Sequence, residues 1–381
     1  MLSGFTGVVM SELRSNEAAQ KIETNGVISE PVNKPWFCVA LLPSGSIFKE
    51  NTDSPASFLS TLQTASIAWI DYVVNDTDFD GHAQNVAKQL GFSQELVSAL
   101  AGEWHEPYHD LDVELGIKLP SIQIIGQEVE PNPLLLLVKK NFIFTIHPLN
   151  VDRRFMRLRR YAETFLKKIP VDIVTADKVT MLLVRIIDHN NDRNFEHLRQ
   201  IEEQSDNLNV FMTDPHTPRE ILGTEIYHMK HTLLTYLNAL WNSLDVLHTL
   251  RYGDAELISD DQKLLDRLGM LSEDVNRQIS LAEHMSDVMA SGLEVLQSIY
   301  NNQLQNLNNR LALLMTYLTI IGTAVLIPNT IATMLGNGVF VIGPEDLGWY
   351  MALMVGSTLT GTLLVYFWIR KQGWIPRKMD K

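Results

Sequence analysis

Two long apolar segments near the C-terminus constrain the fold of this chain more than any other feature. Residues 311–335 and residues 350–369 contain no Asp, Glu, Lys or Arg. The hydrocarbon core of a bilayer is roughly 30 Å thick, and about 20 helical residues span it. Each segment therefore predicts a transmembrane helix. The whole sequence has a net charge of −14, which argues against a nucleic-acid-binding protein.

The lysines and arginines around these segments predict the orientation. The connector 336–348 has neither residue type and carries Glu345 and Asp346. Basic residues follow the second segment, namely Arg370, Lys371, Arg377, Lys378 and Lys381. The positive-inside rule then places both termini in the cytoplasm of a multi-pass protein of the inner or plasma membrane. The single cysteine, Cys38, suits a reducing compartment, and we expect it to be buried and inert.

The N-terminal part predicts an α+β cytoplasmic domain. Apolar β-like runs occupy 36–42, 66–74, 121–125, 133–138 and 142–147, with short helices at 83–90 and 93–101. Asn132-Pro133 and Lys140-Asn141 are typical of turns. Later residues have helical spacing through 177–207 and from Thr217-Pro218 to about Arg251.

Beyond Gly269 no strong helix breaker occurs before Pro328. One helix from about Leu271 to Leu335 would be about 100 Å long, a stalk that enters the membrane. The expected organisation is a flexible tail (1–34), an α/β domain (35–150), a helical region (151–270), the stalk (271–310), a first span (311–335), an external loop (336–348), a second span (349–369) and a basic tail (370–381).

A stripe of polar side chains follows the stalk and the first span. Its members are spaced by seven residues: Asn302, Asn309, Thr316, Thr323, Thr330 and Asn337, with Thr319 and Thr333 on nearly the same face. Polar groups at membrane depth face protein or water. Hydrogen bonding between helices is one interpretation. A pore lined by several copies of the helix is the other, and we favour it because two spans cannot enclose a pore alone.

Neutral hydroxyl and amide oxygens suit a hydrated hard cation such as magnesium. Glu345 and Asp346 would concentrate cations at the outer mouth, and rings of Leu311, Met315 or Leu326 could gate the pore by dewetting. In the second span, Gly356-x-x-x-Thr360 and Ser357-x-x-x-Gly361 predict close helix contact. We expect a transported divalent cation, no cofactor and no enzymatic activity.

Several segments together resemble the CorA family of divalent-cation channels. These are SIAWIDYVV (66–74), QLGFSQELVSALAG with HEPYHDLD (89–112), NFIFTIH (141–147) and LTIIGTAVLIPNTIATMLGNG (318–338). The resemblance covers nearly the whole chain after residue 34. It implies a homopentamer in the lipid bilayer, with five copies of the stripe around one pore.

Two departures from the family pattern bear on selectivity and regulation. The family's Gly-Met-Asn signature is replaced by Gly336-Asn337-Gly338, so Asn337 falls one position early. The ZntB-like branch, linked to zinc and proton transport, also varies this motif and remains an alternative. So does a non-conducting membrane sensor or scaffold.

The family's regulatory acidic pair is replaced by Ser98 and Ala99. In the acidic turn 254–261, Asp260 and Asp261 are substitute metal candidates, although a solvated loop is the simpler interpretation.

Two further motifs are more simply structural. His105-Glu106-Pro107-Tyr108-His109 has zinc-protease spelling, but Pro107 opposes the continuous helix that such a site needs. The basic run within 153–168 lies on an amphipathic helix of an acidic protein, and it predicts salt bridges between helices rather than nucleic-acid binding.

Overall fold

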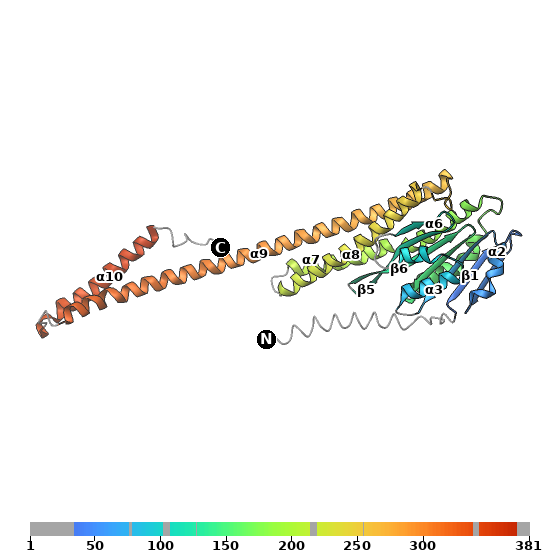
Figure 1. Ribbon diagram of the computed structural model, residues 1–381. Helices are drawn as coiled ribbons and strands as arrows, with labels where there is room; N and C mark the ends of the chain where they lie inside the picture. The colour runs from blue at the N-terminus through green and yellow to red at the C-terminus, as the bar shows by residue number, and fades with distance from the viewer. Residues whose placement is uncertain are drawn as a thin grey trace. The chain divides into compact units, whose positions relative to one another are not determined.

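The computed structural model describes residues 34–75, 78–101, 107–126, 128–213, 219–253, 255–337 and 343–371. The chain forms two compact units, Met1–Ala290 and Ser291–Lys381 (Figure 1). Nearly all of the expected N-terminal tail lies outside the described residues.

A seven-stranded sheet organises the first unit, in the order β2-β1-β3-β7-β6-β5-β4. The central β3–β7 pair is parallel, and the other pairs are antiparallel. The strands are β1 (Trp36–Leu41), β2 (Ile47–Thr52), β3 (Ile67–Val74), β4 (Tyr108–Asp110), β5 (Leu115–Ile125), β6 (Glu128–Lys139) and β7 (Phe142–Pro148).

Helices cover the sheet on its two faces and continue beyond it (Figure 1). The helices are η1 (Pro55–Ser57), α2 (Leu59–Thr64), α3 (Phe79–Gln89), α4 (Gln94–Leu100), η2 (Leu149–Val151), α5 (Asp152–Leu166), α6 (Thr175–Asn191), α7 (Asn194–Thr213), α8 (Arg219–Tyr252), α9 (Gln262–Gly336), η3 (Pro344–Asp346) and α10 (Leu347–Lys371).

The predicted turn at Asn132-Pro133 is wrong, because Pro133 lies within β6 and pairs with Pro120 of β5. The carbonyl of Pro120 accepts a hydrogen bond from Asn190 Nδ2 at 2.9 Å, so this backbone position faces away from β6. The N–H that proline lacks at this position would not have bonded across to β6, so no hydrogen bond between β5 and β6 is lost there. His109 lies in β4 and pairs with Gly116, which agrees with rejecting a helical zinc site.

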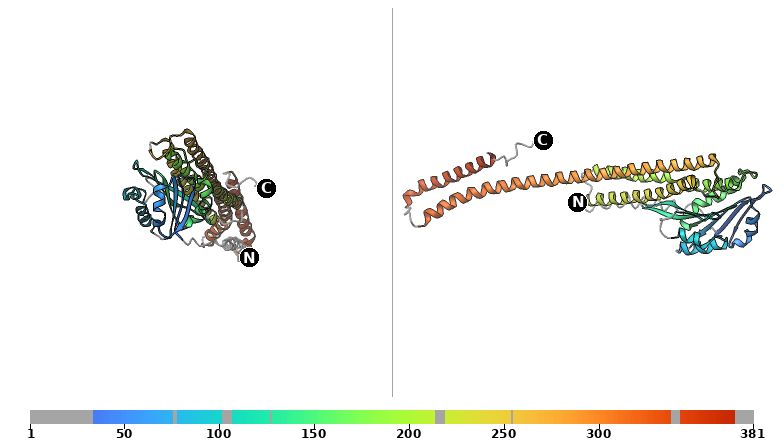
Figure 2. Two further views of the ribbon diagram at one scale, coloured as in Figure 1. Left: turned by 90° about the vertical axis from the view of Figure 1, so that its right-hand side faces the viewer. Right: turned by 45° about the horizontal axis from the view of Figure 1, so that its top comes forward.

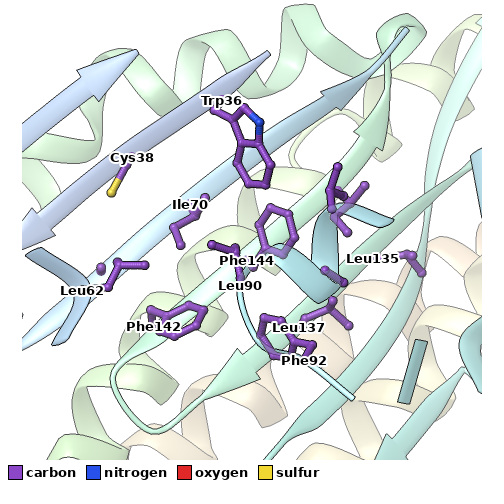
Figure 3. Packing of buried hydrophobic residues seen from close by; sticks show 14 of the residues in the cluster. Trp36, Cys38, Leu62, Ile70, Leu90, Phe92, Leu135, Leu137, Phe142 and Phe144 are labelled. Carbon is purple, nitrogen blue, oxygen red and sulfur yellow. The ribbon is translucent and has the colours of Figure 1, made fainter. Parts of the chain in front are cut away.

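One face of the sheet packs its apolar side chains against α3 and α4. Figure 3 shows Trp36, Ile70, Phe142 and Phe144 gathered in this core, and the Trp36 and Phe144 rings stack with centroids 5.5 Å apart. Cys38 is fully buried in the same cluster. Burial, with a smaller contribution from Glu50, raises the pKa of the Cys38 thiol to about 12, so the thiol is unreactive as expected.

A buried charged network lies at the centre of the sheet, on β3 and β7. Arg159 of α5 donates from Nε to Asp71 Oδ2 at 2.5 Å, and His147 Nε2 lies 3.3 Å from Asp71 Oδ1. Thr145 also donates to Asp71, while the Trp69 indole donates to Thr145 Oγ1 at 3.1 Å. Burial alone would raise the pKa of Asp71, but Arg159 and His147 hold it well below its usual range.

Arg154 has a different role from the predicted inter-helix salt bridges. Its guanidinium donates to the Ile122 carbonyl at 2.7 Å, to the Asn190 carbonyl at 2.8 Å and to Ser121 Oγ at 3.1 Å. Because β4 is short, much of the outer edge of β5 has no strand partner among the described residues. Arg154 and Asn190 supply hydrogen-bond donors to that edge, so the Arg154 cation joins α5 to the sheet and to α6 through neutral acceptors.

The long helical part differs from expectation at two boundaries. The run expected over 177–207 is two helices, α6 and α7, separated at Asp192 and Arg193. α9 begins at Gln262 rather than Leu271 and continues through Gly269. A Cβ at Gly269 would lie 2.6 Å from Arg251 Nη1, so the glycine leaves room for the Arg251 guanidinium of α8 and does not break the helix.

We predict that His197 of α7 makes the fold less stable in mild acid. Burial, and then Arg154 and Arg193, lower the pKa of His197 to about 4, below an unfolded value of about 6.5. The unfolded chain therefore binds more protons between these values. The free energy of unfolding should fall as pH drops below about 6.5, by on the order of 2 kcal/mol at pH 5.

Urea denaturation of the detergent-purified chain at pH 7 and pH 5 measures this difference. His197→Gln should lose that part of the pH dependence. An unchanged dependence in this variant would contradict the role given to His197.

Candidate pore-lining helix

The second unit contains the later part of α9, then η3 and α10. Both long helices are apolar enough to cross a membrane, and the most apolar window of α9 has no buried residue. It is therefore not the core helix of a soluble fold. The two predicted spans are thus helical over their described residues.

Helix α10 packs on α9 through a small residue. Gly361 is buried, and a Cβ there would lie 2.2 Å from Ile327 Cδ1. Gly361, one member of the predicted Ser357-x-x-x-Gly361 pair, therefore contacts an α9 side chain, while the Ser357 hydroxyl donates to the Met354 carbonyl of its own helix at 3.0 Å. Gly356, in contrast, has open space beside it, so the other small-residue pair does not make such a contact within the chain.

Each threonine of the stripe donates its hydroxyl proton to the carbonyl four residues earlier in α9. The bonds are Thr316 to Ala312, Thr319 to Met315, Thr323 to Thr319 and Thr330 to Leu326, each at 2.8 Å, and Thr333 to Asn329 at 2.7 Å. The hydroxyl oxygen keeps its lone pairs for other donors. The stripe is therefore a row of neutral hydrogen-bond acceptors, which water around a cation can bind.

The stripe is largely uncovered in the single chain. Thr319, Thr330 and Thr333 are exposed, as are Asn302 and Asn309, while Thr316 and Thr323 are half-buried. Asn306 Nδ2 donates to Asn302 Oδ1 at 3.4 Å. The threonine hydroxyls of the stripe donate to carbonyls of α9 itself. These bonds do not match the other interpretation, in which the stripe forms hydrogen bonds to α10.

The C-terminal end of the stripe lies beyond the helix. Gly336 is the last residue of α9, and Asn337 is an exposed turn residue after it. Asn337 continues the sequence spacing but not the helix, so the helical period does not fix its direction. Gly338, the last residue of the altered signature, lies outside the described residues.

Helix geometry separates the three gate candidates, which are all exposed on α9. At about 100° per residue, Leu326 lies about 40° from Thr330, Met315 about 40° from Thr319, and Leu311 about 140° from Thr316. Leu326 and Met315 therefore lie beside the stripe, and Leu311 lies on another face of α9.

The two acidic residues of the connector differ in their local contacts. Asp346 accepts hydrogen bonds from the Gly343 N–H at 3.1 Å and from Trp349 Nε1 at 3.0 Å. It stabilises the start of α10 while keeping its charge. Glu345 is exposed and is the carboxylate more open to solvent.

Asp260 and Asp261 precede the first turn of α9, and both are exposed. The Asp261 carbonyl accepts hydrogen bonds from the Leu264 and Leu265 N–H groups at 2.9 and 3.0 Å. The positive end of the α9 helix dipole stabilises the negative charges of these two side chains. Among the described residues, no group of three or more His, Cys, Asp or Glu side chains could hold a metal ion. A regulatory metal at Asp260 and Asp261 stays a prediction, as does the loss of one at Ser98 and Ala99.

Comparison with known families identifies this arrangement. The profile of the family described as CorA-like Mg²⁺ transporter protein matches residues 64–371. The chain belongs to this family. Its description names transporters rather than enzymes, and the two apolar helices are those of a membrane protein.

Solved structures share the fold at low sequence identity. The complete CorA magnesium transporter from Methanocaldococcus jannaschii is 18% identical, with a TM-score of 0.62 over 90% of this chain and 99% of that one. The full-length CmaX protein is 17% identical, with a TM-score of 0.57 over 90% of this chain and 100% of that one. The ZntB cytoplasmic domain from Vibrio parahaemolyticus is 16% identical, with a TM-score of 0.51 over 71% of this chain and 99% of that one. Comparison with curated protein sequences finds no match.

Proposed function

We propose that the chain forms a homopentameric CorA-like channel that passes divalent cations, magnesium first among them, across the inner or plasma membrane. The observation that carries this proposal is the row of threonine acceptors on the uncharged, largely apolar segment 311–335 of α9. Polar groups at membrane depth need protein or water beside them. Since α10 leaves most of the row uncovered, other copies of the chain around a water-filled axis would meet that need.

Ions would enter near Asn337, Glu345 and Asp346, pass Thr330, Thr323 and Thr316, and leave past Asn309 and Asn302 into the cytoplasm. Magnesium dehydrates reluctantly and usually keeps several waters. An acceptor such as the Thr323 hydroxyl oxygen can bind those waters without replacing them.

Uptake into proteoliposomes tests the proposal. We expect magnesium to enter down its gradient without a proton gradient, and cobalt or nickel to compete with it. Native mass spectrometry of the detergent-solubilised chain should give a mass of five copies. Absence of uptake for magnesium, zinc, cobalt and nickel under all gradients would contradict a transport function and leave the sensor or scaffold alternative.

A ZntB-like zinc transporter is the second candidate, because the altered Gly336-Asn337-Gly338 motif and the fold match to a ZntB cytoplasmic domain both allow it. Zinc uptake that increases with an inward proton gradient, with little magnesium uptake, would favour this alternative.

A further inference from the structure

The outer side of α5 carries three exposed arginines. This helix packs on β1 and β2, on the face of the sheet opposite α3 and α4 (Figures 1 and 2). Arg153, Arg157 and Arg160 are spaced by four and three residues, so they lie within about 60° of one another around the helix and span about 10 Å along it. We call them the α5 arginine face. The other two arginines of α5, Arg154 and Arg159, are buried and bonded within the fold.

The salt bridges predicted between helices do not form at the α5 arginine face. Lys167 pairs with Glu163 of the same helix at 2.7 Å. None of the three arginines forms an ion pair with the residues that the structure describes. Like charges three or four residues apart destabilise a helix, and the sequence as a whole has a net charge of −14. Unpaired cations gathered in an acidic protein are a feature that an anionic ligand would explain.

Arginine side chains bind phosphate groups particularly well. The planar guanidinium donates two parallel hydrogen bonds to phosphate oxygens, and neighbouring arginines can bind successive phosphates of one ligand. The face is only about 10 Å long, and the acidic remainder of the chain would repel a long polyanion such as RNA. The length and the surroundings of the face therefore favour a short polyphosphate.

An exposed aromatic ring lies beside the arginines. Tyr161 is 57% exposed, follows Arg160 directly and lies about 40° from Arg157 around α5. A nucleotide base can stack on such a ring, whatever the base. A phosphate-binding face with an aromatic ring at its edge matches the two parts of a nucleotide.

We propose that the α5 arginine face binds a nucleoside triphosphate, with the phosphates on Arg153, Arg157 and Arg160 and the base on Tyr161. This site goes beyond the proposed channel, since it belongs to the first unit alone and uses no residue of the pore.

Isothermal titration calorimetry of the detergent-solubilised full-length chain tests the site, with magnesium removed by a chelator so that ion binding contributes no heat. We expect saturable binding of ATP and of inorganic triphosphate. Arg157→Gln and Arg160→Gln should each weaken both ligands about five- to tenfold, the loss of a charge-assisted hydrogen bond. The matched control is Arg267→Gln, which removes an exposed arginine of α9 and should leave both affinities unchanged. Circular dichroism verifies that the variants are folded.

Tyr161→Leu separates the base from the phosphates. It should weaken ATP about fivefold or more, as expected for a lost stacking contact, and leave inorganic triphosphate unchanged. No change, or an equal loss for both ligands, would overturn the assignment of a nucleotide. So would competition with ATP by a soluble short-chain phosphatidylglycerol at the same phosphate concentration, since this lipid carries phosphate but no base.

Two results would overturn the site itself. One is the absence of saturable binding at millimolar ATP. The other is an affinity in Arg157→Gln equal to that of the natural chain, or one that falls as much in Arg267→Gln, because either would indicate diffuse attraction to the surface. Neither result bears on the proposed function, because ring mass and magnesium uptake are measured separately and without nucleotide.

Discussion

Replacing Arg159 with Met is expected to destabilise the first unit by about 3–5 kcal/mol, the cost of removing one partner of a buried ion pair. Arg159 donates to Asp71 at 2.5 Å, and Asp71 is fully buried in the central strand of the sheet. The variant removes the cation and keeps the carboxylate. We expect a large drop in the urea midpoint of the purified chain, measured by tryptophan fluorescence.

A double variant separates this effect from a general loss of packing. Asp71→Asn together with Arg159→Met removes both charges, so it should be less destabilised than Arg159→Met alone. Simple addition of the two single effects would contradict the coupling. The lowered pKa of Asp71 gives the pH sign: its contribution to stability is present above the unfolded value of about 4 and is lost as pH falls below that value.

Replacing Thr323 with Leu is expected to reduce magnesium uptake by about tenfold or more. In a ring of five copies the change removes five acceptors at one level of the pore, and each hydrogen bond is worth about 0.5–1.5 kcal/mol. A loss of about 1.4 kcal/mol of ion stabilisation already corresponds to tenfold. The measurement is uptake into proteoliposomes at equal protein incorporation.

Two control variants make this result specific to the stripe. Thr323→Ser keeps the hydroxyl and should keep most of the uptake. Val325→Leu adds the same side chain two residues away, about 160° around the helix, and should leave uptake near that of the natural protein. Equal effects of Thr323→Leu and Val325→Leu would count against a pore lined by the stripe.

The elements that the sequence predicts well are those whose signal is local. Residues 311–335 and 350–369 predict their helices because uncharged apolar runs of that length have few alternatives. The strands β1, β3 and β7 were predicted for the same reason, because each is a short apolar run whose signal lies within the segment itself. Strand β2 was missed because Lys49, Glu50 and Thr52 give an edge strand a polar sequence, and β4 was missed because it has only three residues.

Contacts between residues that are distant in the sequence could not be predicted from local patterns. Asp71 pairs with Arg159, 88 positions later in the chain, and nothing in the spacing of either residue names the other. Pro133 was misread as a turn because its tolerance in β6 depends on the distant partners of β5. For the candidate site, the stripe itself was visible in the sequence. The hydroxyl bonds to the carbonyls four residues earlier could also have been predicted, since threonines inside helices commonly make them.

The spacing of the stripe has a consequence for the shape of any bundle built from α9. A seven-residue repeat falls behind a straight helix by about 20° at each step, so Asn302 and Thr330 would point about 80° apart on straight helices. Helices that keep Asn302, Asn309, Thr316, Thr323 and Thr330 on one axis must wind around each other with a left-handed twist. In the proposed assembly, the width and polarity of the ion path are therefore coupled to torsion of α9. Unwinding the helices at one end would turn the hydroxyls at the other end away from the ion.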